Sequence, residues 1–376
     1  MRFVMFYHSL RSGWNHGNAH FLRGVVTELL ARGHEVAVYE PQDAWSAMNL
    51  VADVGPQALE AYREAYPTLE SRTYALADLD LDEVLDGADV VLVHEWNDHE
   101  LVASIGRHRA TTGGYLLLFH DTHHRAVTDA ESMGAYDLRH YDGVLAFGGT
   151  VRDVYLREGW AEQVFVWHEA ADVRVFKPMP EVSRSRDLVW IGNWGDDERA
   201  AELCEFLIEP VEALHLSADV YGVRYPANAI EALAGAAIEF RGFLPNYHAP
   251  RVFAAHRVTV HVPRRPYVLA LPGIPTIRVF EALACGIPLV SAPWDDAEHL
   301  FTPGADYLVA RDGLEMQRLL RDVLHDTSLA SSLAAHGLAT IRARHTCAHR
   351  VDELLAITAR LSLTTFQDRT AACATD

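Results

Sequence analysis

Residues 272–293 read PGIPTIRVFEALACGIPLVSAP, and this stretch decides the fold that we predict. Its start is rich in proline and glycine, which favours a turn, and Thr276 can cap a helix that follows. Apolar residues at helical spacing then form one face, made by Ile277, Phe280, Leu283 and Ala284. Gly286 ends this helix, and residues 288–292 are typical of a buried strand. The stretch therefore reads as a turn, a short helix and a strand.

The start of this helix has the chemistry of an anion site. A helix that begins after Thr276 leaves the N–H groups of Ile277, Arg278 and Val279 unpaired, and this end carries partial positive charge. Such an end suits a diphosphate. Glu281 lies about one turn further in, where its carboxylate could accept two vicinal ribose hydroxyls. The alternative is an ion pair between Arg278 and Glu281 at i, i+3 spacing.

This order of elements resembles the second-domain signature of GT-B glycosyltransferases of the family-4-like group. The wording RVFEALACGIPLV is closer still to bacterial glycosyltransferases related to a spore-maturation protein. The larger group has two glutamates eight positions apart. The second matches Glu281, but the first falls on Gly273, so the carboxylate that normally handles sugar hydroxyls is missing. The resemblance implies two Rossmann-like, doubly wound α/β domains that face a cleft.

Length and composition fit two soluble domains. The chain has 376 residues, and its formal charge of −20 comes from 32 basic and 52 acidic residues. This balance argues against nucleic acid or an anionic membrane as the main partner. The four cysteines show no paired spacing, which favours a reduced, cytoplasmic protein. We find no signal peptide and no transmembrane segment, and the sequence gives no oligomeric state.

The N-terminal region opens with a strand, a loop, a helix and a second strand, which is the start of a doubly wound parallel sheet. Gly13 and Gly17 let the loop approach a ligand closely. The resemblance implies that Gly17 lies beside the donor phosphates. It also implies that Gly13, Asn15 and His16 lie on the acceptor side. The rival interpretation is a dinucleotide-binding site in which Glu40 holds a ribose, but the G-x-G-x-x-G spacing of such sites is absent.

Three buried strands follow, and polar clusters end two of them. The second cluster, HDTHH at residues 120–124, is the richest in imidazoles. Its spacing could hold a metal, so a metal-dependent hydrolase is an alternative function. The resemblance instead places His120 near the transferred sugar, with His123 and His124 either on the acceptor side or solvated. The DLDLDE run at 78–83 mimics a metal motif, but Asp80 is better explained as a helix cap.

The second half repeats the α/β pattern. Around the turn RGFLP, the resemblance implies that the backbone of Phe243 and Leu244 meets the nucleobase, and Asn246 could cap the next helix. Arginines suit a diphosphate leaving group because they stay charged and bind phosphate bidentately. Arg199 and Arg265, with Arg264 beside the latter, are the candidates. Each could also be a solvated surface charge.

We therefore predict a glycosyltransferase that moves a hexose-type sugar from a nucleotide donor, UDP in first place, to a small-molecule or glycan acceptor. We expect it to be retaining, with no metal and no cofactor. An inactive GT-B protein that only binds a sugar or nucleotide is a further alternative. The predicted domains are residues 1–179 on the acceptor side and 187–346 on the donor side. A helix at 347–362 returns to the first domain, and 363–376 forms a tail.

Overall fold

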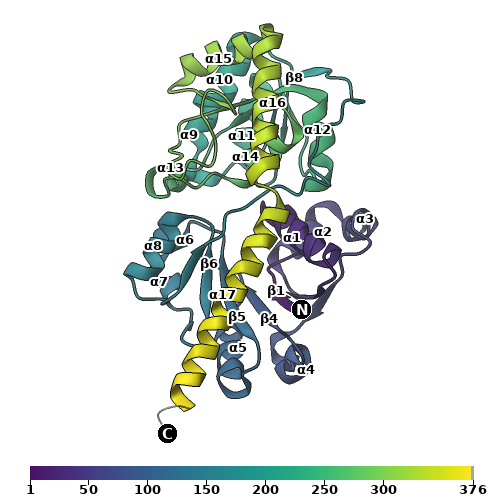
Figure 1. Ribbon diagram of the computed structural model, residues 1–376. Coiled ribbons are helices and arrows are strands. Elements are labelled where there is room, and N and C mark those ends of the chain that lie inside the picture. Colours follow the sequence, from purple (N-terminus) through teal and green to yellow (C-terminus); the bar gives the residue numbers. More distant parts are fainter. Residues whose placement is uncertain (374–376) are drawn as a thin grey trace. The chain divides into compact units, whose positions relative to one another are not determined.

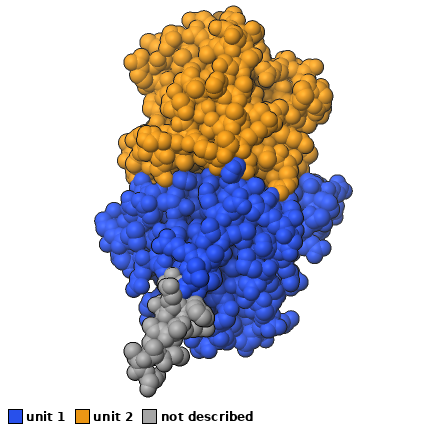
Figure 2. All heavy atoms as spheres, viewed as in Figure 1, with its two compact units in different colours: residues 1–12, 22–169, 347–376 blue, residues 13–21, 170–346 orange. Residues whose placement is uncertain are grey.

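The computed structural model describes residues 1–373, with side chains as far as residue 363. Its contacts divide the chain into two compact units, coloured separately in Figure 2. Unit 1 contains residues 1–12, 22–169 and those from 347 onward; unit 2 contains residues 13–21 and 170–346. The first unit thus ends before the predicted boundary at 179, and part of the first loop groups with unit 2.

Unit 1 is built on a parallel sheet in the order β3-β2-β1-β4-β5-β6-β7. Its strands are β1 (Arg2–Phe6), β2 (Glu35–Pro41), β3 (Ser71–Tyr74), β4 (Val90–His94), β5 (Leu116–Asp121), β6 (Gly143–Ala146) and β7 (Val164–Val166). Runs such as Val90–His94 are buried along their whole length, because helices cover both faces of the sheet (Figure 1). The order reverses between β1 and β4, where doubly wound sheets bind ligands.

The helices of unit 1 connect these strands. They are α1 (Ala19–Ala31), α2 (Trp45–Val54), α3 (Gln57–Ala65), η1 (Leu76–Asp78), α4 (Leu81–Leu85), α5 (His99–Thr112), α6 (Arg125–Thr128), α7 (Ala130–Gly134), α8 (Gly149–Arg157) and α17 (Cys347–Cys373). The Asp80 carboxylate accepts from the N–H of Glu83 at 3.2 Å, which confirms it as the cap of α4. α17 packs against β5, and the indole of Trp167 donates to the carbonyl of Arg350 at 2.8 Å.

Unit 2 repeats the architecture with a parallel sheet in the order β10-β9-β8-β11-β12-β13. Its strands are β8 (Arg186–Ile191), β9 (Ala218–Tyr221), β10 (Ile238–Phe240), β11 (His256–His261), β12 (Leu289–Ser291) and β13 (Leu308–Val309). Here the order reverses between β8 and β11. Both sheets therefore have the strand order of a doubly wound nucleotide-binding fold, and the predicted fold class is confirmed.

The helices of unit 2 are η2 (Asp196–Glu198), α9 (Ala200–Leu203), the π-helical η3 (Cys204–Ile208), α10 (Glu209–Leu214), α11 (Ala227–Gly235), η4 (Asn246–His248), α12 (Ala249–Ala255), α13 (Arg265–Ala270), α14 (Ile277–Cys285), α15 (Gly313–His325) and α16 (Thr327–Arg344). α14 ends at Gly286, whose φ of +66° is the left-handed cap that the sequence predicts. Except for Arg278, the residues of α14 are buried.

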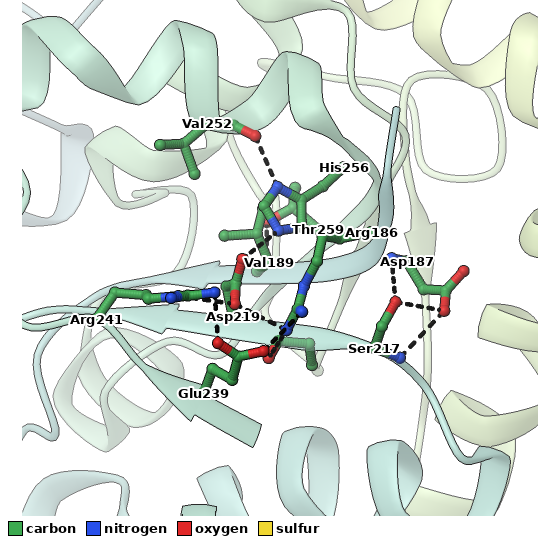
Figure 3. A network of polar contacts seen from close by, with 11 residues as sticks. Arg186, Asp187, Val189, Ser217, Asp219, Glu239, Arg241, Val252, His256 and Thr259 are labelled. Atoms are coloured by element: carbon green, nitrogen blue, oxygen red, sulfur yellow. Dashed lines mark hydrogen bonds and ion pairs between the residues drawn. The ribbon is translucent and has the colours of Figure 1, made fainter. Parts of the chain in front are cut away.

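A charged network joins β8, β9 and β11 where these strands begin (Figure 3). Asp219 on β9 binds Arg186 at 2.9 Å and Arg241 at 3.1 Å, and His256 faces its other oxygen at 3.1 Å. His256 donates its second N–H to the carbonyl of Val252 at 2.7 Å. These contacts pair a carboxylate that is 4% exposed, as a buried charge requires.

Three local predictions differ from the structure. Asn246 opens η4 and does not cap α12, because Ala249 begins that helix after His248. The α/β pattern expected for the second half is interrupted after β8, where η2, α9 and a π-helical turn stand in place of one helix. Residues 363–373, expected as a frayed tail, continue α17 as a helix, and the last three residues lie outside the described part.

Candidate functional site

The start of α14 lies at the carboxyl edge of the unit 2 sheet, and Thr276 does not cap it with its side chain. Burial and the charge of Arg199 lower the pKa of His261 to about 3, so this imidazole is neutral. Ser291 donates to the carbonyl of Ala292 and so accepts from Nδ1 of His261 at 2.9 Å. His261 Nε2 must then accept, which makes Thr276 the donor at 3.1 Å. The Thr276 side chain therefore bonds His261 and does not cap α14. The N–H of Val279 donates to the Thr276 carbonyl at 3.1 Å, so the prediction that this N–H is unpaired is wrong.

Glu281 is fully buried and both of its carboxylate oxygens are engaged. His20 donates from Nδ1 to Oε1 at 2.7 Å, and the Arg278 guanidinium contacts Oε2. Burial alone would raise the pKa of Glu281, but Arg278 and His20 outweigh it and hold the pKa below its usual value. The i, i+3 ion pair that we considered as an alternative is therefore present. Ribose binding by Glu281 stays a prediction.

The loop between β1 and α1, residues 7–18, meets other parts of unit 2 through its glycine-rich half. A Cβ on Gly17 would lie 3.2 Å from the side chain of Ile277, and one on Gly13 would lie 3.4 Å from Asn246. Asn15 has a φ of +46° and accepts a hydrogen bond from the Asn193 side chain. Gly17 therefore lies beside Ile277, a predicted donor residue, whereas Gly13 and Asn15 lie beside Asn246 and Asn193, which the sequence did not assign to the donor.

Arg199 is 7% exposed and its guanidinium faces backbone carbonyls. It donates to Val262 O at 3.1 Å, to Trp194 O at 3.4 Å and to Asn193 O. These carbonyls belong to the loops after β8 and β11, so Arg199 ties together the two sides of the switch point. Its geometry supports a role in holding these loops; direct contact with a phosphate stays a prediction.

The arginines after β11 differ in their surroundings. Burial, then Arg264 and Arg278, lower the pKa of Arg199 to about 9, so these three guanidiniums lie close enough to repel one another. Arg264 binds Glu198 at 2.9 Å. Arg265 instead binds Glu202 at 2.7 Å, with 45% of its side chain exposed. Arg264 and Arg278 thus both act on the charge of Arg199, and we call these three residues the cationic cluster; Arg278 lies in the first turn of α14.

Gly273, which replaces the first motif glutamate, has a φ of +86° and donates to Asp295 O at 2.6 Å. A Cβ here would lie 2.5 Å from Cγ of Glu298 and 3.1 Å from its backbone nitrogen. Gly273 is thus required both by its backbone angle and by the Glu298 side chain that covers it. A carboxylate occupies this space, although it comes from another loop.

The remaining predicted donor residues lie in the turn after β10. Phe243 and Leu244 are partly exposed, and Gly242 precedes them with a φ of +72°. The carbonyl of Gly242 accepts from Gly222 at 2.9 Å, which fixes the turn against the loop after β9. On the β1–α1 loop, His16 is 7% exposed.

The polar residues of unit 1 collect where β1, β4 and β5 end. His120 has no exposed surface, and its ring packs edge-on against Trp167 and His94 at 4.8 and 5.4 Å between centroids. Contact of His120 with a sugar therefore needs these neighbours to move, and its role stays a prediction. Nδ1 of His124 lies 2.8 Å from the hydroxyl of Thr128. The rings of His123 and His124 lie side by side, with centroids 4.0 Å apart.

Burial shifts the pKa values of the side chains at this edge of the sheet. It raises the pKa of Glu95 to about 7, and together with Glu95 it raises the pKa of Asp121 to about 7. Burial and Arg125 lower the pKa of His94 to about 3. Thr122 donates to Glu95 at 3.1 Å, and Tyr155 donates to Asp121 at 2.9 Å.

The two rival interpretations gain little from the structure. Among the side chains described, no group of three or more His, Cys, Asp or Glu residues is arranged to hold a metal ion. Glu40, the candidate for a dinucleotide ribose, is fully buried. Ser9 and Ser71 donate to its carboxylate at 3.0 and 2.6 Å, and Arg11 donates through its backbone and side chain. Glu40 thus anchors the β1–α1 loop.

Sequence reasoning missed His20 and His261. His20 stacks on Phe176 at 4.2 Å between ring centroids and pairs with Glu281, which is 261 positions away. No local pattern announces such a pair. His261 ends a buried strand, and a polar residue at that position was the available signal.

Comparison with solved structures supports the fold described above. The fold matches sucrose-phosphate synthase from Thermosynechococcus elongatus at a TM-score of 0.63 and 14% identity, over 97% of this chain and 100% of that one. It matches HepE of Anabaena, solved with UDP and glucose, at 0.66 and 14%, over 96% and 99%. It matches an alpha-glucosyltransferase, solved with UDP-glucose and DNA, at 0.68 and 11%, over 96% and 99%.

The fold is therefore that of GT-B glycosyltransferases. Residues 199–356 match a family described as glycosyl transferase-like, which covers most of unit 2 and the start of α17. No curated protein matches the sequence. The closer likeness to spore-maturation-related glycosyltransferases stays a prediction. Within residues 1–373, no helix is long and apolar enough to cross a membrane.

Proposed function

We propose that the protein transfers a hexose-type sugar from a nucleoside diphosphate donor to a small-molecule or glycan acceptor. The observation that carries this proposal is the cationic cluster at the start of α14, where Arg264 and Arg278 both act on the charge of buried Arg199. The Thr276 side chain hydrogen-bonds His261 and does not cap α14, so the N–H groups of Ile277 and Arg278 are the ones that would meet the anion. The UDP named in the HepE and alpha-glucosyltransferase structures supports UDP as the nucleotide.

In this reaction the bond between the anomeric carbon and the diphosphate oxygen breaks, and a bond to an acceptor oxygen forms. UDP leaves with increased negative charge, which oriented N–H groups and guanidiniums stabilise. These groups can supply the positive charge, so we propose a reaction that needs no metal. In a retaining reaction the acceptor approaches on the side of the leaving group, whose phosphate can take the acceptor proton.

The other predicted residues have these roles in the proposal. Glu281, which like His120 has no exposed surface, accepts ribose hydroxyls through the second lone pairs of its oxygens once its neighbours move. Phe243 and Leu244 present backbone to the nucleobase, Arg265 assists the diphosphate, and His120 meets the sugar after its neighbours move.

Calorimetric titration of UDP tests the donor site. We expect wild-type protein to bind UDP and Glu281→Gln to bind it at least tenfold more weakly. Glu239→Gln is a matched control, because Glu239 also pairs with arginines of unit 2, Arg186 and Arg241, but it is half exposed and lies outside the proposed site. Unchanged UDP affinity in Glu281→Gln, with an unchanged circular dichroism spectrum, would contradict the proposed site. Titration in EDTA checks the metal independence.

An inactive protein that binds a nucleotide sugar is the second candidate function. The enclosure of His120 favours it, because this side chain has no exposed surface. Hydrolysis of a panel of UDP-sugars without an acceptor separates the candidates: release of UDP supports a transferase, and binding without release supports the inactive protein.

A further inference from the structure

We propose that the exposed ring of Trp96 is a stacking platform for a neutral pyranose of the acceptor. Trp96 follows β4 at the carboxyl edge of the unit 1 sheet, and its side chain is 41% exposed. The inference deepens the proposed function, because the choice of a glycan as acceptor rests on it.

The platform is held rigidly from one side. The Arg125 guanidinium lies 4.0 Å from the centroid of the Trp96 ring and donates to the carbonyl of Glu95 at 2.7 Å. The Tyr136 hydroxyl contacts the same carbonyl and lies 3.1 Å from that of Asn97. The backbone on both sides of Trp96 is therefore fixed, so binding of a sugar ring costs little conformational entropy at this side chain.

Imidazoles border the exposed ring. His123 meets it edge-on, with centroids 5.2 Å apart, and His8 lies at 5.9 Å. Burial, helped by His94, lowers the pKa of His8 to about 4, so this ring is neutral near pH 7. A neutral imidazole has one donor and one acceptor nitrogen, which suits hydroxyl groups. An aromatic face bordered by such groups matches a pyranose, which has apolar C–H faces and a rim of hydroxyls.

Charge decides between a sugar and the other rings that stack on tryptophan. A single-stranded nucleic acid also stacks its bases on aromatic side chains, but it needs a positive groove for its phosphates. The chain carries a formal charge of −20. The cation beside the platform, Arg125, already lies against Trp96 and donates to the backbone. A neutral glycan therefore fits this edge better.

Saturation-transfer NMR with maltotriose, cellotriose and chitotriose tests the platform. We expect at least one trisaccharide to bind wild-type protein, with affinity retained in Trp96→Phe and reduced at least tenfold in Trp96→Ala. Trp45→Ala is the matched control, because Trp45 on α2 is similarly exposed, at 47%. Its affinity should equal that of wild type. A thermal melt of each variant checks folding.

The inference is overturned if no trisaccharide binds, if Trp96→Ala binds as wild type does, or if octathymidylate binds and depends on Trp96 instead. The UDP titration runs in parallel and reports on the proposed function separately. Trisaccharide binding at Trp96 without UDP binding would keep the glycan platform and reject the transferase.

Discussion

The two sheets reverse their strand order in the same way, but the ionisable groups at their carboxyl edges differ. In unit 1, burial leaves His8 and His94 neutral and raises the pKa values of Glu95 and Asp121 to about 7. In unit 2, Arg264 and Arg278 act on the charge of buried Arg199, and Arg278 lies in the first turn of α14. We therefore propose that one fold, used twice, provides one edge for uncharged ligands and one for an anion.

Removing the buried guanidinium should damage the unit 2 edge most. Arg199→Met loses three hydrogen bonds to carbonyls of the switch point, and charged hydrogen bonds contribute about 1.5–3 kcal/mol each. Because the buried charge also costs free energy, we expect a net loss of about 2–4 kcal/mol in urea unfolding. Arg265→Met, at the exposed pair, should change stability by less than about 0.5 kcal/mol. Equal effects in both variants would erase the difference that we draw between them.

The neutral edge of unit 1 predicts an unusual pH dependence. Burial raises the pKa of Glu95 from 4.5 to about 7, so the folded state holds a proton that the unfolded chain has released. Its contribution to stability is present below about pH 4.5 and is lost as the pH rises through about 7. Glu95→Gln, which also relieves Asp121, should therefore be more stable than wild type at pH 8.5 by up to about 3 kcal/mol.

The comparison needs unfolding curves of both proteins at pH 5 and pH 8.5. The difference between the curves reports on Glu95 together with Asp121, whose pKa is raised in part by Glu95. A stability difference that is the same at both pH values would mean that Glu95 is charged in the folded protein.

The contact between Gly273 and Glu298 predicts a smaller effect. Gly273→Ala places a Cβ against Glu298 at a φ of +86°, and such backbone strain costs about 1–3 kcal/mol. Gly235→Ala, at the end of α11 with nothing within 4 Å, is the control and should leave stability unchanged or raise it slightly. Thermal unfolding of the two variants measures the difference in their stability. If Gly235→Ala were destabilised as much as Gly273→Ala, the predicted difference would be absent.

Arg264 and Arg265 are neighbours in the sequence, but we expect them to contribute differently to UDP binding. Arg264→Ala should weaken UDP binding about tenfold, or about 1.4 kcal/mol, because Arg264 belongs to the cationic cluster. Arg265→Ala should weaken it less, because Arg265 pairs with Glu202 at the surface. Titration calorimetry at one salt concentration compares them. The reverse ranking would restore Arg265 as the leaving-group residue.

The sequence predicted the elements that have a strong local signal. Buried runs such as Val90–His94 lie where expected, because burial on both faces dictates their composition. The glycine cap at Gly286 also lies where expected, whereas the side chain of Thr276 does not cap the helix. β3 was missed, since SRTY at 71–74 is a polar edge strand with no apolar pattern. The helix over 363–373 was missed for a similar reason, because small and polar residues resemble a tail.

The candidate site could be predicted by residue type but not by pairing. Glu281 and Arg199 stood out in the sequence, yet their partners are His20 and the carbonyls of residues 193, 194 and 262. Such partners meet only after the sheets form. The raised pKa of Glu95 also depends on burial, which cannot be predicted from the spacing of residues in the sequence.

Glu298 packed over Gly273 has a consequence for how this loop can change in evolution. A glutamate cannot return to position 273 by one substitution, because the backbone angle and the side chain above it both exclude a Cβ. A viable route must first shorten residue 298. The two positions should therefore vary as a pair among homologues, with glycine at 273 tolerating a long side chain at 298 and a larger residue at 273 demanding a small one.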